Sequence, residues 1–336
     1  GLLCPRKLDH YRRVPEDVAA ATSTSVAALS SNTAGGRLRF STDSEYIAIY
    51  AEMPSMADMS HFARTGSSAF DIYVKCGAKY VYHDTFMPTL GDHYEAISRF
   101  KVPGMKDVML HFPTYSDVKN LYIGVAEGSR IEHSAPYRYL KPVVYYGSSI
   151  TQGACASRPG NAYEAIISND LDCDFINLGF SGSALAEEAI TDYINSLDMS
   201  VFVMDYDHNA PNPEHLERTH EAFFKKIRAS HPDLPVIMIS RPTFEEGYGG
   251  PHAYGISVIP PENEMLRCRE VVFRTYMNAV NAGDRNVYFI DGASLFNGPH
   301  ADLCTVDGVH PNDAGFLRMA DRIGSFVSAA LPEDPA

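Results

Sequence analysis

The sequence contains no tryptophan and only six cysteines in 336 residues. The cysteines are scattered and no two form a C-x-x-C pair, which argues against a disulfide framework and against a structural zinc site. Their sparse distribution favours a reducing compartment, so we expect a cytoplasmic protein. A chain that begins at Gly1 nevertheless leaves open a leader removed from its front.

Long apolar runs and an excess of positive charge are also missing. No stretch approaches the roughly 20 apolar residues that a membrane-spanning helix needs. The formal net charge is −14, from 28 Lys and Arg against 42 Asp and Glu. Nucleic acids and anionic membranes both bind clustered basic side chains, so we expect neither as a partner.

Short stretches of alternating apolar and polar side chains occupy residues 35–130. In one of them Phe70, Ile72 and Val74 would share a face, and the C-G-A-K that follows has the composition of a hairpin turn. A period of two with frequent turn signals is typical of many short antiparallel strands. The N-terminal half is therefore predicted to be a β-sandwich, jelly roll or barrel.

From about residue 142 the pattern changes to short, continuously apolar strands that alternate with helices. Five such strands are predicted, at 142–147, 174–180, 200–206, 235–242 and 286–292. This alternation predicts a parallel sheet with helices on both faces, an α/β fold. With the boundary in S-A-P-Y-R-Y-L-K-P, we expect a β domain over residues 1–138 and an α/β domain over residues 139–336.

Polar residues follow the predicted strands at the edge where such sheets bind ligands. The segments are G-S-S-I-T-Q-G (147–153), N-L-G-F-S-G-S-A (177–184), D-Y-D-H-N-A-P (205–211) and, before the last helix, D-G-V-H (307–310). Together they offer a serine nucleophile, a histidine base, an orienting carboxylate and oxyanion donors. That set is what acyl transfer requires.

In the reaction that these residues suggest, His310 accepts the proton of a serine hydroxyl, which is a poor nucleophile without a base. Asp307 lies three residues earlier, a spacing that lets its carboxylate reach the imidazole and fix the tautomer. Candidate oxyanion donors are the backbone N–H groups of Ser149 and Gly182 and the side-chain amide of Asn209. The reaction needs no metal and no organic cofactor, and we expect none.

These four segments resemble the blocks of the SGNH subgroup of the GDSL hydrolase superfamily. The family has Gly-Asp-Ser after strand one, Gly after strand two, Gly-x-Asn-Asp after strand three and Asp-x-x-His before the last helix. The resemblance covers residues 142–331 and implies a flavodoxin-like three-layer fold. It also implies a triad of Ser149, Asp307 and His310, with Gly182 and Asn209 as oxyanion donors.

Two departures from the family pattern bear on the substrate. Ser148 stands where the family usually has an aspartate, and we expect it to position Ser149 by hydrogen bonding. The third block reads Y-D-H-N, so residues 206–208 would crowd the site differently. The N-terminal half resembles the β domain that carries G-x-D-L-Y in some of these hydrolases, read here as A-F-D-I-Y at residues 69–73.

Ser148 and several further residues are candidates for the substrate pocket. His208 adjoins Asn209 and could line the pocket; a purely structural role for this histidine is an equal alternative. The long segment 241–263 follows the fourth strand, where long loops commonly bind ligands, and it would contribute Arg241, Tyr248 and Tyr254. The alternative for this segment is a solvated insertion.

Several features have simpler structural interpretations. Asn312 or Asp313 could cap the last helix next to His310. Cys155 could be a thiol nucleophile, but no histidine adjoins it in sequence, which favours a buried cysteine. The side chains of His83, Asp84, Asp92, His93 and Glu95 fit no standard metal spacing, which favours a polar loop.

The predicted function is a serine esterase that cleaves short acyl esters, with acetyl preferred, on a carbohydrate or small metabolite through an acyl-enzyme on Ser149. Two alternatives remain open. One is an acyltransferase with the same triad, and the other is a glycan-binding protein on a catalytically dead scaffold. Oligomerisation also remains open.

Overall fold

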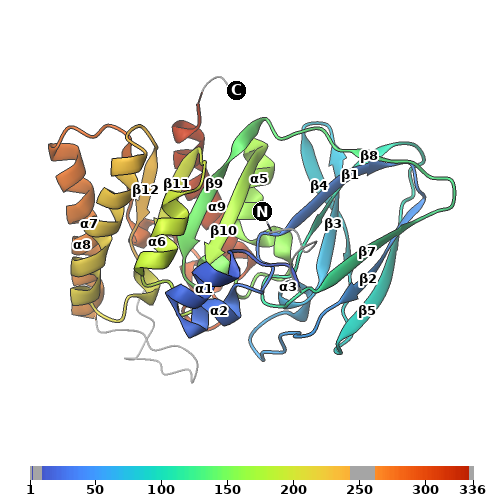
Figure 1. Ribbon diagram of the computed structural model, residues 1–336, viewed down its shortest axis with the longest axis horizontal. Helices are drawn as coiled ribbons and strands as arrows, with labels where there is room; N and C mark the ends of the chain where they lie inside the picture. The colour runs from blue at the N-terminus through green and yellow to red at the C-terminus, as the bar shows by residue number, and fades with distance from the viewer. Residues whose placement is uncertain (1, 3–9, 243–261, 333–336) are drawn as a thin grey trace.

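The computed structural model describes residues 2, 10–242 and 262–332. In this part of the chain an antiparallel β-sandwich lies beside a three-layer α/β domain with a parallel sheet (Figure 1). The predicted fold class is confirmed. The division of the chain between residues 138 and 139 stays a prediction.

Two antiparallel sheets form the sandwich. Their strands are β1 (Arg37–Thr42), β2 (Tyr46–Glu52), β3 (Phe70–Cys76), β4 (Lys79–Phe86), β5 (His93–Arg99), β6 (Lys106–His111), β7 (Asn120–Val125) and β8 (Ile131–His133), with the short helix α3 (Arg64–Ser67) before β3. The strand orders are β4-β3-β6-β1-β8 and β5-β2-β7. Phe70 and Ile72 of β3 are fully buried between the sheets. The turn from β3 to β4 contains Gly77 with φ +66°, a conformation that favours glycine.

Five parallel strands form the second domain, in the order β10-β9-β11-β12-β13. They are β9 (Tyr139–Gly147), β10 (Cys173–Gly179), β11 (Val201–Asp205), β12 (Val236–Ile239) and β13 (Val287–Ile290). Numbered from β9 along the chain, this is the 2-1-3-4-5 order of flavodoxin-like folds. The order reverses between β9 and β11, so the ligand crevice is expected beyond the carboxyl ends of those two strands.

Helices cover both faces of the parallel sheet (Figure 1). They are α4 (Ser149–Gln152), α5 (Tyr163–Leu171), α6 (Glu188–Asn195), α7 (Pro213–Ser230), α8 (Glu262–Asn281) and α9 (Asp313–Ala330). Buried side chains of α6, α7 and α8 pack on one face, and those of α5 and α9 pack on the other. Burial on both faces explains why residues 143–147 of β9 are continuously apolar. No described helix combines the length and the apolar character needed to cross a membrane.

Two helices before the sandwich, α1 (Glu16–Thr22) and α2 (Thr24–Leu29), were not predicted. Their buried residues Ala19 and Val26 belong to the same apolar cluster as Phe202 of β11. The start of the β half of the chain therefore packs on the α/β domain, next to α6.

Arg13 fixes this N-terminal segment to the parallel sheet. Its side chain is 2% exposed. The guanidinium donates hydrogen bonds to the carbonyl oxygens of Leu29 (2.7 Å), Asn32 (2.9 Å) and Gly179, and it lies over the ring of Phe180. Burial lowers the pKa of Arg13 to about 9, so this side chain remains charged at neutral pH.

We expect Arg13→Ala to lower the free energy of unfolding by about 3 kcal/mol or more, because orphaned buried polar groups cost about 1–3 kcal/mol each. Urea unfolding followed by circular dichroism measures this change. Arg64→Ala is the matched control, since Arg64 and its partner Asp58, 3.0 Å apart, both have exposed side chains and such pairs contribute about 0–1 kcal/mol. Equal losses in the two variants would contradict the anchoring role of Arg13.

Buried polar contacts also join the sandwich to the α/β domain. Arg37 of β1 donates to Asp174 at 2.5 Å and lies 3.6 Å from the ring centroid of Phe175. Asp71 of β3 is fully buried and accepts a hydrogen bond from the N–H of Gly160 at 3.0 Å. Burial raises the pKa of Asp71 to about 7. The A-F-D-I-Y stretch thus lies at the contact between the domains.

Candidate active site

Ser149 is the first residue of α4, directly beyond the carboxyl end of β9. Ser148 is the N-cap of this helix, and its buried hydroxyl accepts a hydrogen bond from the N–H of Ile150 at 3.2 Å. A Cβ on Gly179 of β10 would lie 2.2 Å from the nitrogen of Gln152, so glycine there lets α4 rest on the strand end. Ser148 therefore stabilises the turn that presents Ser149.

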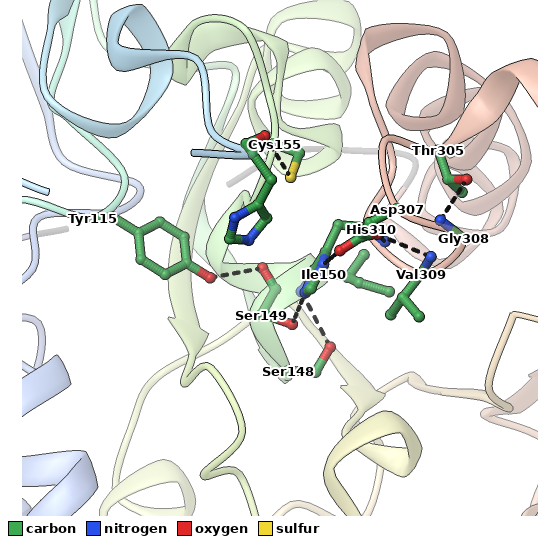
Figure 2. A network of polar contacts seen from close by, with 11 residues as sticks. Tyr115, Ser148, Ser149, Ile150, Cys155, Thr305, Asp307, Gly308, Val309 and His310 are labelled. Carbon is green, nitrogen blue, oxygen red and sulfur yellow. Dashed lines mark hydrogen bonds and ion pairs between the residues drawn. The ribbon is translucent and has the colours of Figure 1, made fainter. Parts of the chain in front are cut away.

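A continuous chain of hydrogen bonds links the three predicted triad residues (Figure 2). Ser149 Oγ lies 2.9 Å from His310 Nε2, and His310 Nδ1 lies 2.7 Å from Asp307 Oδ2. The other carboxylate oxygen of Asp307 accepts the backbone N–H groups of His310 (2.7 Å) and Val309 (3.0 Å). The structure thus brings together side chains that lie about 160 residues apart in sequence.

The Asp307 carboxylate controls the state of the imidazole. Burial raises the pKa of Asp307, but the hydrogen bonds from His310 and Val309 outweigh that effect and lower the pKa to about 2. An ionised Asp307 favours the proton on His310 Nδ1 and leaves the Nε2 lone pair directed at Ser149. The arrangement can therefore deprotonate the hydroxyl.

The start of α9 next to His310 is capped, as the sequence predicted, and this cap is compatible with the triad geometry. Asn312 caps α9, and its side chain accepts the N–H groups of Ala314 (3.0 Å) and Gly315 (3.2 Å). Asp313 instead accepts the N–H of Ser157 at 2.9 Å. The capped helix start supports the loop that carries Asp307 and His310.

Asn209 and Gly182 lie on the loops that follow β11 and β10, the two neighbours of β9. Asn209 ends the 3-10 turn η3 (Asp207–Asn209), and its amide donates to the carbonyl of Phe180 at 2.7 Å. One N–H of an amide suffices for this bond, so the second can serve another acceptor. Gly182 is exposed, with φ +65°. Their role as oxyanion donors stays a prediction.

The sandwich domain contributes a wall of the site that the sequence did not reveal. The ring centroid of Phe62 lies 4.7 Å from that of Tyr115 and 6.4 Å from that of His310. The Tyr115 hydroxyl donates to the carbonyl of Ser149 at 3.3 Å (Figure 2). His61 also faces the base, with ring centroids 5.9 Å apart. These residues belong to no motif, and only the packing of two domains brings them here.

The remaining pocket candidates differ in their placement. Arg241 is 6% exposed, and its backbone N–H and guanidinium donate to the Oδ2 (2.7 Å) and carbonyl (2.9 Å) of Asp207. It therefore stabilises the turn that ends at Asn209. Burial lowers the pKa of His208 well below its usual value, and the charges of Arg241 and His310 act in the same direction. The two predicted tyrosines, 248 and 254, lie outside the described residues.

Cys155 is a buried thiol that lies close to two histidines distant from it in sequence. Burial raises the pKa of Cys155 to about 12, which keeps the thiol protonated and disfavours it as a nucleophile. Its Sγ contacts the carbonyl of His61 at 3.4 Å. Histidines are thus close in space although none is adjacent in sequence.

The acidic and histidine-rich residues 83–95 do not converge on a common point. His93 pairs with Asp92 at 2.6 Å, Asp84 accepts from Ser98 at 2.8 Å and His83 contacts the carbonyl of Arg99 at 3.1 Å. These local pairs occupy the polar atoms individually. Among the described residues no group of potential metal ligands involves this segment.

Solved structures with the same architecture include several esterases. A Bacteroides ovatus ATCC 8483 protein assigned as a GDSL-like lipase is 29% identical, with a TM-score of 0.85 over 95% of this chain and 91% of that one. A salicylyl-acyltransferase from a tetracycline biosynthetic pathway is 19% identical, with a TM-score of 0.73 over 98% and 92% of the chains. A family two carbohydrate esterase from Clostridium thermocellum is 12% identical, with a TM-score of 0.64 over 98% of each chain. The last two show the fold alone.

Family models match both halves of the sequence. The N-terminal domain of SGNH-type esterases, named GxDLY, matches residues 1–131, and the GDSL-like lipase/acylhydrolase family matches residues 140–328. A search of curated proteins found no match. Since the second model spans more than half of the chain, this protein belongs to the GDSL-like lipase/acylhydrolase family of ester hydrolases.

Proposed function

We propose that the protein is a serine esterase that hydrolyses short acyl esters, acetyl esters above all, of a carbohydrate or small metabolite. The observation that carries the proposal is the hydrogen-bonded chain from Ser149 Oγ through His310 to Asp307, at the carboxyl end of β9. An ester hydrolase family and a nucleophile–base–carboxylate geometry together support acyl-enzyme chemistry.

The chemistry follows from the positions of these atoms. His310 Nε2 takes the proton of Ser149 Oγ while the oxygen attacks the ester carbonyl carbon. The N–H groups of Ser149 and Gly182 and the amide of Asn209 stabilise the resulting oxyanion. The imidazolium, held by Asp307, gives its proton to the departing alcohol and leaves the acyl group on Ser149. Water then attacks with His310 as base and releases the carboxylic acid.

The walls of the site support a small acyl group. Phe62 and His61 from the sandwich domain lie against His310, while Tyr115 contacts the carbonyl of Ser149. We infer that these side chains border the acyl group and favour a short one. Carbohydrate esterases share the two-domain fold over nearly its whole length, which supports a sugar as the alcohol.

A substrate panel tests this proposal. The p-nitrophenyl esters of acetate, butyrate and octanoate are compared with acetylated oligosaccharides, and acid release is measured. We expect kcat/KM to fall with acyl length and acetate to be released from the oligosaccharides. Preference for octanoate would overturn the short-acyl assignment. Formation of a new ester with an added alcohol, without acid release, would instead identify an acyltransferase.

Removal of the amide of Asn209 tests the oxyanion hole. Asn209→Ala is expected to lower kcat by about 100-fold or more, because one such donor contributes about 3–4 kcal/mol to the transition state. Asn212→Ala is the control: its side chain caps α7 by accepting the N–H of His215 at 2.9 Å, and its loss costs about 1 kcal/mol of stability with kcat retained. An unchanged kcat for Asn209→Ala on p-nitrophenyl acetate would exclude it from the oxyanion hole.

A further inference from the structure

Three side chains with metal-binding atoms meet in the proposed active site. They are His61 from the sandwich domain, Cys155 from the segment after α4, and His310 itself. One ligand atom from each lies within 4.8 Å of the other two. Two imidazole nitrogens and one sulfur are donors that zinc and related transition metals prefer over hard cations.

One nitrogen of this cluster has no hydrogen-bond partner among the described residues, and two further donor atoms have one partner each. His61 Nδ1 is buried and has no hydrogen-bond partner among the described residues, and a buried polar atom in that state is costly. His310 uses Nδ1 for Asp307, which leaves Nε2, now 2.9 Å from Ser149 Oγ. The Cys155 thiol donates one hydrogen bond, 3.4 Å long, to the carbonyl of His61.

The backbone at Cys155 is strained. Its φ is +65°, in the left-handed region that residues other than glycine seldom adopt. Such a conformation is unfavourable, and strained residues of this kind cluster at active sites and ligand-binding sites. Here it accompanies a sulfur placed next to two histidines of different domains.

We propose that His61, Cys155 and His310 form an inhibitory site for a divalent transition metal of the zinc class. The metal bonds to one nitrogen of each histidine and to Cys155 Sγ, and the thiol proton passes to solvent. Water or the Ser149 hydroxyl completes four-coordination. From Zn–N and Zn–S bond lengths, ligand atoms around zinc lie roughly 3.3–3.7 Å apart, so the side chains draw inward by about 1 Å.

Such a metal has two separable consequences. Bonded to His310 Nε2, it removes the lone pair that would accept the proton of Ser149, so no acyl-enzyme forms. This inhibition rests on the proposed function. Since His61 comes from the sandwich and Cys155 from the α/β domain, the metal also cross-links the domains and raises the unfolding temperature. Binding and stabilisation do not depend on the reaction.

Metal titration of the chelator-treated full chain tests the proposal. Zn²⁺ binding is measured by calorimetry and thermal unfolding, and hydrolysis of p-nitrophenyl acetate is measured in parallel. We expect one Zn²⁺ per chain, and at least a tenfold weaker Kd and inhibition constant in both Cys155→Ala and His61→Ala, each compared with its own metal-free rate. Mg²⁺, which prefers oxygen ligands, should not compete.

Cys76→Ala is the matched control, because Cys76 is an exposed thiol at the end of β3. It should retain the Kd and inhibition constant of the unmodified chain. With Co²⁺ in place of Zn²⁺, a thiolate-to-metal charge-transfer band should appear and be lost only in Cys155→Ala. Equal Zn²⁺ sensitivity in all three variants, or no Zn²⁺ binding at all, would overturn the proposal. Zn²⁺ binding to a chain without esterase activity would support the metal site and refute the proposed function.

Discussion

Ser149→Ala will lower kcat/KM for ester hydrolysis by at least about 10,000-fold, because the covalent route is lost while substrate binding and the oxyanion donors remain. The His310 imidazole lies 2.9 Å from the hydroxyl that the substitution removes. Within residues 10–242 and 262–332, Ser149 is the only residue whose hydroxyl is hydrogen-bonded to this ring. Steady-state kinetics with p-nitrophenyl acetate measures the loss. A serine-directed phosphonate should label Ser149 alone, and His310→Ala should abolish the labelling.

The adjacent serine is the control for this experiment. Ser148→Ala removes the acceptor for the N–H of Ile150, which costs about 1 kcal/mol of stability as the loss of an N-cap. The Ser148→Ala variant should still react with the phosphonate at Ser149. An adduct on Ser148, or wild-type activity in Ser149→Ala, would contradict the assignment of the nucleophile.

The sequence revealed the fold because both periodicities are local. Continuous apolarity in residues 143–147 of β9 reports burial on two faces, and the structure bears this out. Alternation in β3 predicted burial on one face only, but Asp71 and Tyr73 on the other face are buried as well, because that face packs against the α/β domain. Parallel topology then places the carboxyl ends of β9, β10 and β11 at one edge, which explains how four short segments could be assigned to one site before its geometry was known.

What the sequence concealed depends on contacts between distant segments. Apolar residues recur near helical spacing over residues 183–197. Helix α6 nevertheless begins at Glu188, because Ala186 has φ +57° and donates its N–H to the hydroxyl of Tyr146 at 2.9 Å. Helices α1 and α2 are short and rich in alanine, so no apolar stripe marked them. His61 is a loop residue of the sandwich, and its place beside His310 arises only when two domains pack.

Asp307→Asn is expected to reduce kcat/KM by about 10,000-fold while the fold is retained, because the substitution reverses the imidazole tautomer. Asp307 Oδ1 accepts two backbone N–H groups, from His310 at 2.7 Å and Val309 at 3.0 Å. An asparagine must place its carbonyl oxygen there, since an NH₂ group would face two donors. The NH₂ then occupies the position 2.7 Å from His310 Nδ1 and requires a lone pair on that nitrogen.

The ring proton consequently moves to His310 Nε2. This nitrogen then has no lone pair with which to accept the proton of Ser149. Asp313→Asn is the control, because it removes the same charge from a residue whose carboxylate accepts the N–H of Ser157 at 2.9 Å instead of the imidazole. Nitrogen NMR of the histidine ring should show protonated Nε2 in Asp307→Asn and protonated Nδ1 in Asp313→Asn. Activity of Asp307→Asn within tenfold of the unmodified enzyme would mean that a partner other than this carboxylate sets the tautomer of His310.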